Sequence, residues 1–371
     1  MLKGSLLCAL AAIAAWADDA PKGKVIDNGT FALYVPTAYS KDSAWPLIVA
    51  FDPRARGRVP AELFQTAAET YGYIVVGSNV SRNGSMEQSW EAARAMLTDV
   101  STRYSIHPKR IYAAGLSGGA RVSFALAMGS NIFSGVIASA AGFHDGQMHK
   151  TAAFPIFATT GTEDFNYLEM RSLDRELTSP HRLVVFEGGH AWLSSELAIE
   201  AVEWMELQAM KAGSRPKDDR LIGMLFTKRS ASIDLLRDEK EKYVATAALA
   251  ADFDGLRDVT EVAVRAATLA KTKAVKDGLK EDRDNDERES RLMAEVFGLE
   301  RNAERPESRS DSLRQLRQQL ISIKKKSAAK EDSAERRSAR RVLQSMYASV
   351  RERGAGVNAE VRKLVEEIRG Q

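Results

Sequence analysis

Cysteine is nearly absent from this sequence, which contains a single one, Cys8, among 371 residues. Cys8 lies in an apolar run, LLCALAAIAAWA, that follows a basic start and ends in small residues. This arrangement is typical of an export signal, and we expect cleavage after Ala17. The mature chain then has no thiol, which excludes disulfides, cysteine nucleophiles, iron–sulfur clusters and cysteine-ligated zinc.

Long hydrophobic runs are missing as well. The N-terminal run is shorter than the roughly 20 residues that a helix needs to cross a bilayer, and no later segment is apolar enough to do so. The sequence therefore predicts a secreted or periplasmic protein without a transmembrane segment. We expect neither a cofactor nor a metal ion.

Charged residues are scarce in the first part of the chain and abundant in the second. Residues 209–371 contain 36 Lys and Arg and 29 Asp and Glu, out of 53 and 50 in the whole chain. All five tryptophans lie before residue 209. We therefore predict a signal peptide at 1–17, a globular α/β domain at 18–208 and a charged all-α region at 209–371.

Short apolar runs alternate with helical patterns in the first part, which is typical of a mostly parallel sheet covered by helices on both faces. The expected strands are residues 47–51, 73–78, 111–115, 135–140, 155–161 and 182–186. The expected helices are residues 61–71, 87–104, 119–129, 167–178 and 192–212. FALYV, residues 31–35, is expected to form an antiparallel edge strand.

Helical patterns continue through the charged second part. They cover residues 229–251, 256–280, 284–297, 307–329, 331–353 and 357–369. We expect Gly255, Gly298, Pro306 and Gly354 to separate them, because glycine and proline interrupt helices. Helical hairpins and partly extended amphipathic helices are the two forms that this pattern allows.

The segment RIYAAGLSGGARVSFALAM, residues 110–128, contains a G-x-S-x-G pattern centred on Ser117. A β-branched and aromatic run precedes the serine and a helical pattern follows it, so the serine falls in a strand-to-helix turn. Such a turn projects a strained serine hydroxyl beyond the end of the strand, while small neighbours let strand and helix approach closely. Ser117 is therefore the candidate nucleophile, and the alternative is a glycine-rich turn with an incidental serine.

A serine hydroxyl is a weak nucleophile at neutral pH, so it needs a histidine base and an acid that orients the histidine. Asp164 follows one expected strand and His190 follows the next. The order Ser117, Asp164, His190, with each residue on its own loop after a strand, is the α/β-hydrolase arrangement.

Other residues compete for these two roles. His107 precedes the strand that leads to the candidate nucleophile, which places it at the opposite edge of the sheet. His144 follows an expected strand and forms, with Asp145, the alternative pair. Glu163 is a weaker candidate than Asp164 for the acid, because we expect Glu163 to face solvent.

The reaction also needs two N–H donors for the oxyanion. We expect one from the backbone of Gly118, directly after the nucleophile. The second is expected from the loop after the strand at 47–51, where Pro53 has no N–H and the amide of Arg54 comes next. The side chains of Arg54 and Arg56 either face solvent or recognise an acidic or hydroxylated substrate.

Residues 24–207 resemble the α/β-hydrolase superfamily and, within it, compact serine esterases similar to polyhydroxybutyrate depolymerase and to feruloyl or acetylxylan esterases. The matching motifs are RIYAAGLSGGA around Ser117, GTED ending at Asp164, and EGGHAW containing His190. The resemblance implies an α/β-hydrolase three-layer sandwich. The chain departs from these esterases at Asp52-Pro53, where many hydrolases carry His-Gly.

The connections between the last expected strands are short, which leaves no room for a large cap domain over the site. An open cleft suits a bulky or polymeric ester substrate. Trp192, Phe143, Tyr167 and Trp90 are candidates for aromatic walls of this cleft, with ordinary packing as the alternative.

The charged region has one strongly basic segment. Arg336-Arg337 and Arg340-Arg341 are four residues apart and share a helix face, and Lys324–Lys326 lie nearby. Such a face either contacts an anionic surface or a protein partner, or is solvated and balanced by nearby acids. Export and the lack of interleaved aromatic residues argue against nucleic acid.

The sequence thus predicts an exported serine esterase that acts through an acyl-enzyme. A peptidase with the same machinery is the nearest alternative. A second alternative is a weakly active hydrolase-like module whose helical tail binds a partner or an anionic surface.

Overall fold

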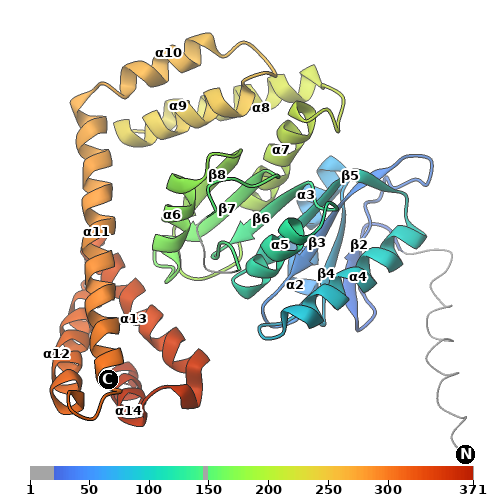
Figure 1. Ribbon diagram of the computed structural model, residues 1–371. Helices are drawn as coiled ribbons and strands as arrows, with labels where there is room; N and C mark the ends of the chain where they lie inside the picture. Colours follow the sequence, from blue (N-terminus) through green and yellow to red (C-terminus); the bar gives the residue numbers. More distant parts are fainter. Residues whose placement is uncertain (1–20, 145–148, 371) are drawn as a thin grey trace, which may run out of the picture. The chain divides into compact units, whose positions relative to one another are not determined.

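The computed structural model describes residues 21–144 and 149–370 (Figure 1). The predicted signal peptide, Cys8 and Asp145 lie outside these described residues. Within the described ranges, no helix is both long and apolar enough to cross a membrane.

One sheet of eight strands, in the order β1-β2-β4-β3-β5-β6-β7-β8, organises the first part of the chain. The strands are β1 (Val25–Asp27), β2 (Phe31–Tyr34), β3 (Trp45–Phe51), β4 (Ile74–Ser78), β5 (Ile106–Leu116), β6 (Gly135–Ser139), β7 (Ile156–Gly161) and β8 (His181–Phe186). Strand β3 is parallel to β4 and to β5, and β5 is parallel to β6. All seven strands expected from the sequence are present, and the expected mostly parallel sheet is confirmed.

The expectation that FALYV forms an edge strand was wrong. Its residues form β2, which is antiparallel to β4 as expected but also pairs with β1 on its other side. The short β1 is therefore the edge, and the residues of β2 are all buried. Only three residues long, β1 has too short an alternation to be detected from sequence.

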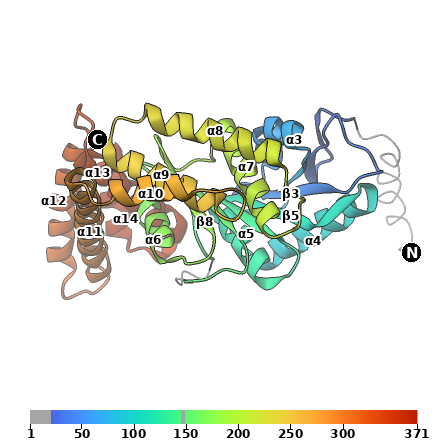
Figure 2. The ribbon, with the colours of Figure 1, turned by 90° about the horizontal axis from the view of Figure 1, so that it is seen from above.

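Helices cover both faces of the strands in the first part of the chain. They are α2 (Arg58–Leu63), α3 (Gln65–Tyr71), α4 (Met86–Arg103), α5 (Gly118–Gly129), α6 (Tyr167–Glu176) and α7 (Ser195–Lys211). In Figure 2, α3 and α7 lie on one side of β3 and β5, while α4 and α5 lie on the other. This arrangement confirms the expected three-layer sandwich. The helix expected at 61–71 is two helices, divided at the buried Phe64.

The connections between the last strands are short, as expected. Between β6 and β7 the described residues form no helix, and between β7 and β8 the chain forms only α6. No cap domain is inserted at these two points of the described chain.

The chain divides into two compact units that do not follow the composition boundary at residue 208. The first unit comprises residues 1–158, 176–182 and 192–217, and the second comprises 159–175, 183–191 and 218–371. The boundary therefore passes through β7 and β8, and residue 208 lies inside α7. Helix α7 keeps its buried apolar residues up to Met210, so the change in charge does not coincide with the end of the helix.

The second unit contains the charged helices, which confirms the expected all-α region. They are α8 (Asp219–Leu235), α9 (Glu239–Phe253), α10 (Thr260–Leu269), α11 (Lys273–Asn302), α12 (Arg309–Ser327), α13 (Ala334–Arg353) and α14 (Ala359–Gly370). Their pairwise packing, α8 with α9 and α9 with α10, forms the expected hairpins.

Several of the expected helix boundaries were wrong, including the helix expected at 256–280, which is divided between α10 and α11. The pattern at 229–251 is broken before α9, because the Asp238 side chain accepts a hydrogen bond from the amide of Glu241 and caps a new helix. Between Lys273 and Asn302 the chain is one continuous helix, α11, although two helices were expected there. Gly298 lies inside α11, since one glycine costs a helix only about 1 kcal/mol and packing of the neighbouring Val296 outweighs it.

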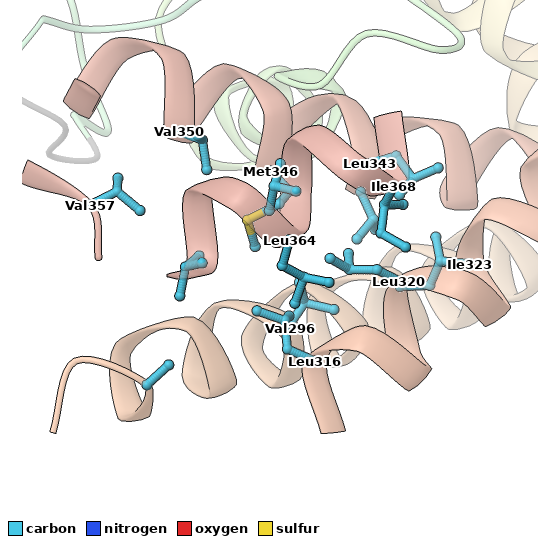
Figure 3. Close-up of a cluster of buried hydrophobic side chains, with 14 of the residues drawn as sticks. Val296, Leu316, Leu320, Ile323, Leu343, Met346, Val350, Val357, Leu364 and Ile368 are labelled. Atoms are coloured by element: carbon cyan, nitrogen blue, oxygen red, sulfur yellow. The ribbon is translucent and has the colours of Figure 1, made fainter. Parts of the chain in front are cut away.

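Four of these helices, α11, α12, α13 and α14, share a hydrophobic core of their own (Figure 3). Its fully buried residues include Val296 from α11, Leu320 from α12, Met346 from α13 and Ile368 from α14. The charged residues occupy the remaining faces of the helices. This region is therefore a packed helical bundle rather than a set of extended helices.

We expect Leu320→Ala to lower the free energy of unfolding of this bundle by about 2–5 kcal/mol, because it leaves a cavity in a core that cannot fully collapse. Its neighbour Ile321 is 48% exposed, so Ile321→Ala is the matched control and should cost less than about 1 kcal/mol. Urea unfolding followed by circular dichroism measures both, since all tryptophans lie outside the bundle. Equal losses for the two variants would contradict this core.

Candidate active site

Ser117 lies in the turn between β5 and α5, where the sequence predicts it. Its backbone has φ 54° and ψ −121°, a conformation that non-glycine residues adopt only under strain. The Ser117 amide donates to the carbonyl of Ser139 at 2.8 Å, at the end of β6. The neighbouring strand therefore holds the serine in this strained turn at the carboxyl end of a central strand.

Two of the glycines around Ser117 are required by close backbone contacts. A Cβ on Gly115 would lie 2.1 Å from the carbonyl oxygen of Gly119, and a Cβ on Gly119 would lie 1.9 Å from the carbonyl oxygen of Phe51. Both atoms belong to the backbone and cannot move aside. The small residues thus let β3, β5 and the start of α5 meet, as the motif predicts.

The space beside Gly118 is occupied by a side chain that the sequence analysis did not single out. A Cβ on Gly118 would lie 1.9 Å from Oδ1 of Asn83. The backbone N–H of Asn83 donates to the carbonyl of Pro53 at 3.0 Å. This hydrogen bond fixes the loop after β4 against the loop after β3. No signal in the sequence links residues 83 and 118, because the loop after β4 meets this turn only in the folded sheet.

The loop after β3 is organised by Asp52, whose side chain is fully buried. Its oxygens accept hydrogen bonds from the Arg54 amide at 2.9 Å, from Nε and Nη2 of Arg56, both at 2.9 Å, and from Nε1 of Trp192 at 3.0 Å. Burial by itself raises the pKa of Asp52, but the hydrogen bonds from Arg56, Trp192 and Arg54 outweigh it and hold the pKa below its ordinary value.

This network changes the roles predicted for the loop. The Arg54 amide, predicted as an oxyanion donor, donates to the Asp52 carboxylate instead, because an aspartate side chain readily bonds the amide two residues on. Arg56 is paired with Asp52 rather than solvated alone. Trp192, predicted as a cleft wall, directs its indole N–H to the same carboxylate.

The other predicted aromatic walls also have packing roles. Phe143 is 4% exposed and its ring lies 4.5 Å from that of Phe124, so it belongs to the core. Tyr167, at the start of α6, lies under the guanidinium of Arg341. Trp90 packs over Gly129, where a Cβ would lie 2.6 Å from the indole ring.

Asp164 and His190 form a hydrogen-bonded pair inside the second unit. Nδ1 of His190 lies 2.8 Å from Oδ1 of Asp164, whose side chain is fully buried, whereas the His190 side chain is 19% exposed. Oδ1 of Asp164 also accepts from the Asn166 amide at 2.8 Å. Because a carboxylate accepts from Nδ1–H, the neutral imidazole carries its lone pair on Nε2.

The loops that carry these two residues are bonded to each other. The Thr162 amide donates to the Phe186 carbonyl at 2.8 Å, and the Glu163 amide donates to the Gly188 carbonyl at 2.7 Å. A Cβ on Gly161 would lie 2.4 Å from the carbonyl oxygens of Gly188 and Gly189, so glycine is required for this approach. The hydrogen bonds between the ends of β7 and β8 therefore fix the distance between Asp164 and His190.

The stacking of Phe165 on His190 was not predicted. The two ring centroids lie 4.0 Å apart with an interplanar angle of 25°, so the phenyl ring covers one face of the imidazole. Glu163 was expected to face solvent, which was wrong. Its carboxylate accepts from Arg340 at 2.6 Å and from Arg336 at 3.3 Å, because α13 brings these cations to the loop.

The other histidines of the chain include the two alternatives, His107 and His144. His107 is the second residue of β5, at the opposite end of the strand from Ser117. The ring of His149 lies 4.5 Å from the ring of Phe143, and Nδ1 of His181 lies 2.7 Å from the Ser179 carbonyl oxygen. His144 is exposed, and Asp145, the other member of its pair, lies outside the described residues.

The two halves of the predicted site lie in different compact units, with Ser117 in the first and the Asp164–His190 pair in the second. Ser117 is in a strand-to-helix turn, and Asp164 and His190 are hydrogen-bonded to each other. Among the residues that the structure describes, no group of three or more His, Cys, Asp or Glu side chains could hold a metal ion.

No protein-family model matches this sequence, and no curated protein sequence matches it. Solved esterases are similar to part of it. Est1E from Butyrivibrio proteoclasticus is 16% identical, with 51% of this chain and 98% of that chain covered and a TM-score of 0.36. A feruloyl esterase module from Clostridium thermocellum, complexed with sinapinate, is 12% identical, with coverages of 46% and 80% and a TM-score of 0.35. A hyperthermophilic esterase from Pyrobaculum calidifontis is 13% identical, with coverages of 56% and 91% and a TM-score of 0.38.

We expect Gly119→Ala to destabilise the first unit by more than about 1 kcal/mol, because the added Cβ overlaps the Phe51 carbonyl oxygen. Gly118→Ala is the matched control, since its Cβ meets only the end of the exposed Asn83 side chain, which can rotate away. Thermal unfolding followed by tryptophan fluorescence compares the two. A larger loss of stability in Gly118→Ala than in Gly119→Ala would contradict this close contact between Gly119 and Phe51.

We expect Asp52→Asn to be less stable than the natural protein at pH 7, with a difference that shrinks in acid. The folded state holds the pKa of Asp52 below its ordinary value of 3.8, so the charged carboxylate contributes stability above that value. This contribution is lost as the pH falls through the lowered pKa. Urea unfolding between pH 7 and pH 3 measures the difference, and one that stays constant over this range contradicts the linkage.

Proposed function

We propose that this chain is a serine hydrolase that cleaves carboxylic esters, with Ser117 as nucleophile, His190 as general base and Asp164 as the group that orients His190. The observation that carries the proposal is the 2.8 Å hydrogen bond between buried Asp164 and His190. It occurs in a chain that also holds a serine at φ 54° in a strand-to-helix turn. These are the parts that nucleophilic acyl transfer requires.

His190 is suited to move a proton. Its Nδ1–H donates to Asp164, so Nε2 accepts the proton of the Ser117 hydroxyl as that oxygen attacks. The imidazolium that forms is stabilised by the carboxylate of Asp164, whose side chain is fully buried. His190 then returns the proton to the leaving alcohol.

The acyl carbon passes through a tetrahedral intermediate whose oxygen carries the negative charge. The Gly118 amide, directly after the nucleophile at the first turn of α5, is the donor that we assign to this oxygen. The Arg54 amide has no part in the proposal, because it donates to Asp52. Loss of the alcohol leaves an acyl-enzyme on Ser117, and water activated by His190 releases the acid.

We also propose that the protein is exported, because its sequence begins with a run typical of an export signal. We propose bulky or polymeric esters as substrates, because the short connections on both sides of β7 hold no cap domain. The same machinery cleaves peptides, so amide substrates are the alternative that an assay must separate. The second alternative, a helical tail that binds an anionic surface, has less support, because Arg336 and Arg340 bind Glu163 within the same unit.

The purified full chain should hydrolyse short p-nitrophenyl esters, and Ser117→Ala should lower kcat by about 10⁴-fold or more. Asp164→Asn should lower kcat by about 10³–10⁴-fold, because an asparagine favours the wrong imidazole tautomer. A fluorophosphonate probe should label Ser117, as mapped by peptide mass spectrometry. Hydrolysis of p-nitroanilides at a comparable kcat/KM would instead indicate a peptidase.

Ser130→Ala, at the other end of α5, is the matched control for the nucleophile and should keep the activity of the natural protein. Equal rates for the natural protein and Ser117→Ala would reject the proposed function. Labelling at a serine other than Ser117 would reject the assigned nucleophile.

A further inference from the structure

Helix α13 makes hydrogen bonds to the residues on both sides of Asp164. The guanidinium of Arg341 donates to the carbonyl of Thr162, and the hydroxyl of Ser345 donates to the carbonyl of Phe165 at 3.4 Å. Between them, Arg340 donates to the Glu163 carboxylate at 2.6 Å. Three of the four residues from 162 to 165 are therefore held by a helix that follows them by more than 170 positions.

Arg341 is the centre of this contact. It is 6% exposed, and its Nε donates to Oε1 of Glu289 at 2.8 Å while Nη2 donates to Oε2, so the two side chains form a buried bidentate pair. Its guanidinium carbon lies 4.2 Å from the centre of the Tyr167 ring. The Arg341 side chain thus contacts Thr162 at the start of the loop that carries Asp164, Tyr167 directly after that loop, and Glu289 of α11.

A buried guanidinium has little freedom, because its planar group must satisfy several partners at once. Burying an arginine–glutamate pair contributes little net stability compared with apolar residues, so we assign this pair a geometric role rather than a stabilising one. Other residues of α13, including Val342, Met346 and Val350, pack into the hydrophobic core of the bundle. Helix α13 therefore connects that core rigidly to the loop that carries Asp164.

We propose that Arg341 and Arg340 are positioning residues for the Asp164–His190 pair, so that the C-terminal bundle is a working part of the active site. The inference rests on the proposed function. Only five residues separate β7 from α6, and a shift of this loop moves both the Asp164 carboxylate and the Phe165 ring that covers His190. Misplacement of a catalytic group by about 1 Å can cost about 10²-fold in rate.

The test is the double variant Arg341→Met/Glu289→Met in the full chain. It replaces both members of the buried pair by apolar side chains of similar length and leaves no unpaired buried charge. The matched control is Arg317→Met/Glu367→Met, which removes a bidentate pair with 45% and 42% exposed side chains between α12 and α14. Active sites are counted by fluorophosphonate titration, so that rates refer to folded enzyme.

We expect the Arg341/Glu289 variant to lose about 10- to 100-fold in kcat per titrated site, with little change in KM. We also expect the low-field proton signal of His190 Nδ1, assigned by its absence from Asp164→Asn, to shift or broaden. The Arg317/Glu367 control should keep the kcat and the His190 proton signal of the natural protein. A kcat and a proton signal equal to those of the control would overturn the proposal.

If the double variant does not fold, the single variant Arg340→Gln tests the positioning role. Arg340 has a 35% exposed side chain, so Arg340→Gln should fold normally. We expect it to lower kcat several-fold, and Glu163→Gln should add little further loss to it, because the two residues act through one contact. Natural kcat in Arg340→Gln overturns the proposal, as does full additivity of the two losses.

The proton signal separates this inference from the proposed function. It reports the hydrogen bond between His190 and Asp164 whether or not the chain hydrolyses esters. A natural protein without labelling at Ser117 rejects the proposed function, whereas an unchanged proton signal in a folded Arg341/Glu289 variant rejects the positioning role alone.

Discussion

The hydrogen bond between Nδ1 of His190 and Oδ1 of Asp164 is the interaction on which the proposed chemistry depends. It forms because β7 and β8 end at the same level, with their loops bonded through the amides of Thr162 and Glu163. Burying a carboxylate is costly unless it is hydrogen-bonded, and here the imidazole and the Asn166 amide both bond Oδ1 of Asp164. The pair is thus a consequence of strand register as much as of residue identity.

In each unit, buried carboxylates are paired with arginines nearby. Asp52 binds Arg56, Trp192 and the Arg54 amide in the first unit, while Glu163 and Glu289 bind the arginines of α13 in the second. In both cases a loop that leaves the end of a strand is held by an ion pair. Arg340 and Arg341 of α13 therefore make their ion pairs within their own unit.

Much of the fold could be predicted from the sequence, because buried parallel strands are short continuous apolar runs and the helices between them are amphipathic. The features that the sequence did not predict are local ones that leave no periodic pattern of apolar residues. The three-residue β1, the break before α9 capped by Asp238, and the uninterrupted α11 across Gly298 depend on pairing, capping and packing. The division of the chain into units also escaped prediction, because composition changes inside α7 while contacts divide β7 and β8.

The turn that holds Ser117, the chain order of Ser117, Asp164 and His190 on three loops after strands, and the charged helical region could all be inferred from the residues alone. These follow from local rules of spacing, backbone conformation and periodicity. Three contacts could be seen only in the folded chain. The Arg54 amide donates to the Asp52 carboxylate, the Phe165 ring stacks on His190, and Arg341 donates to the Thr162 carbonyl in the loop that carries Asp164. Each of these contacts joins groups whose proximity depends on loop geometry or on packing between distant segments, and a linear pattern carries no information about either.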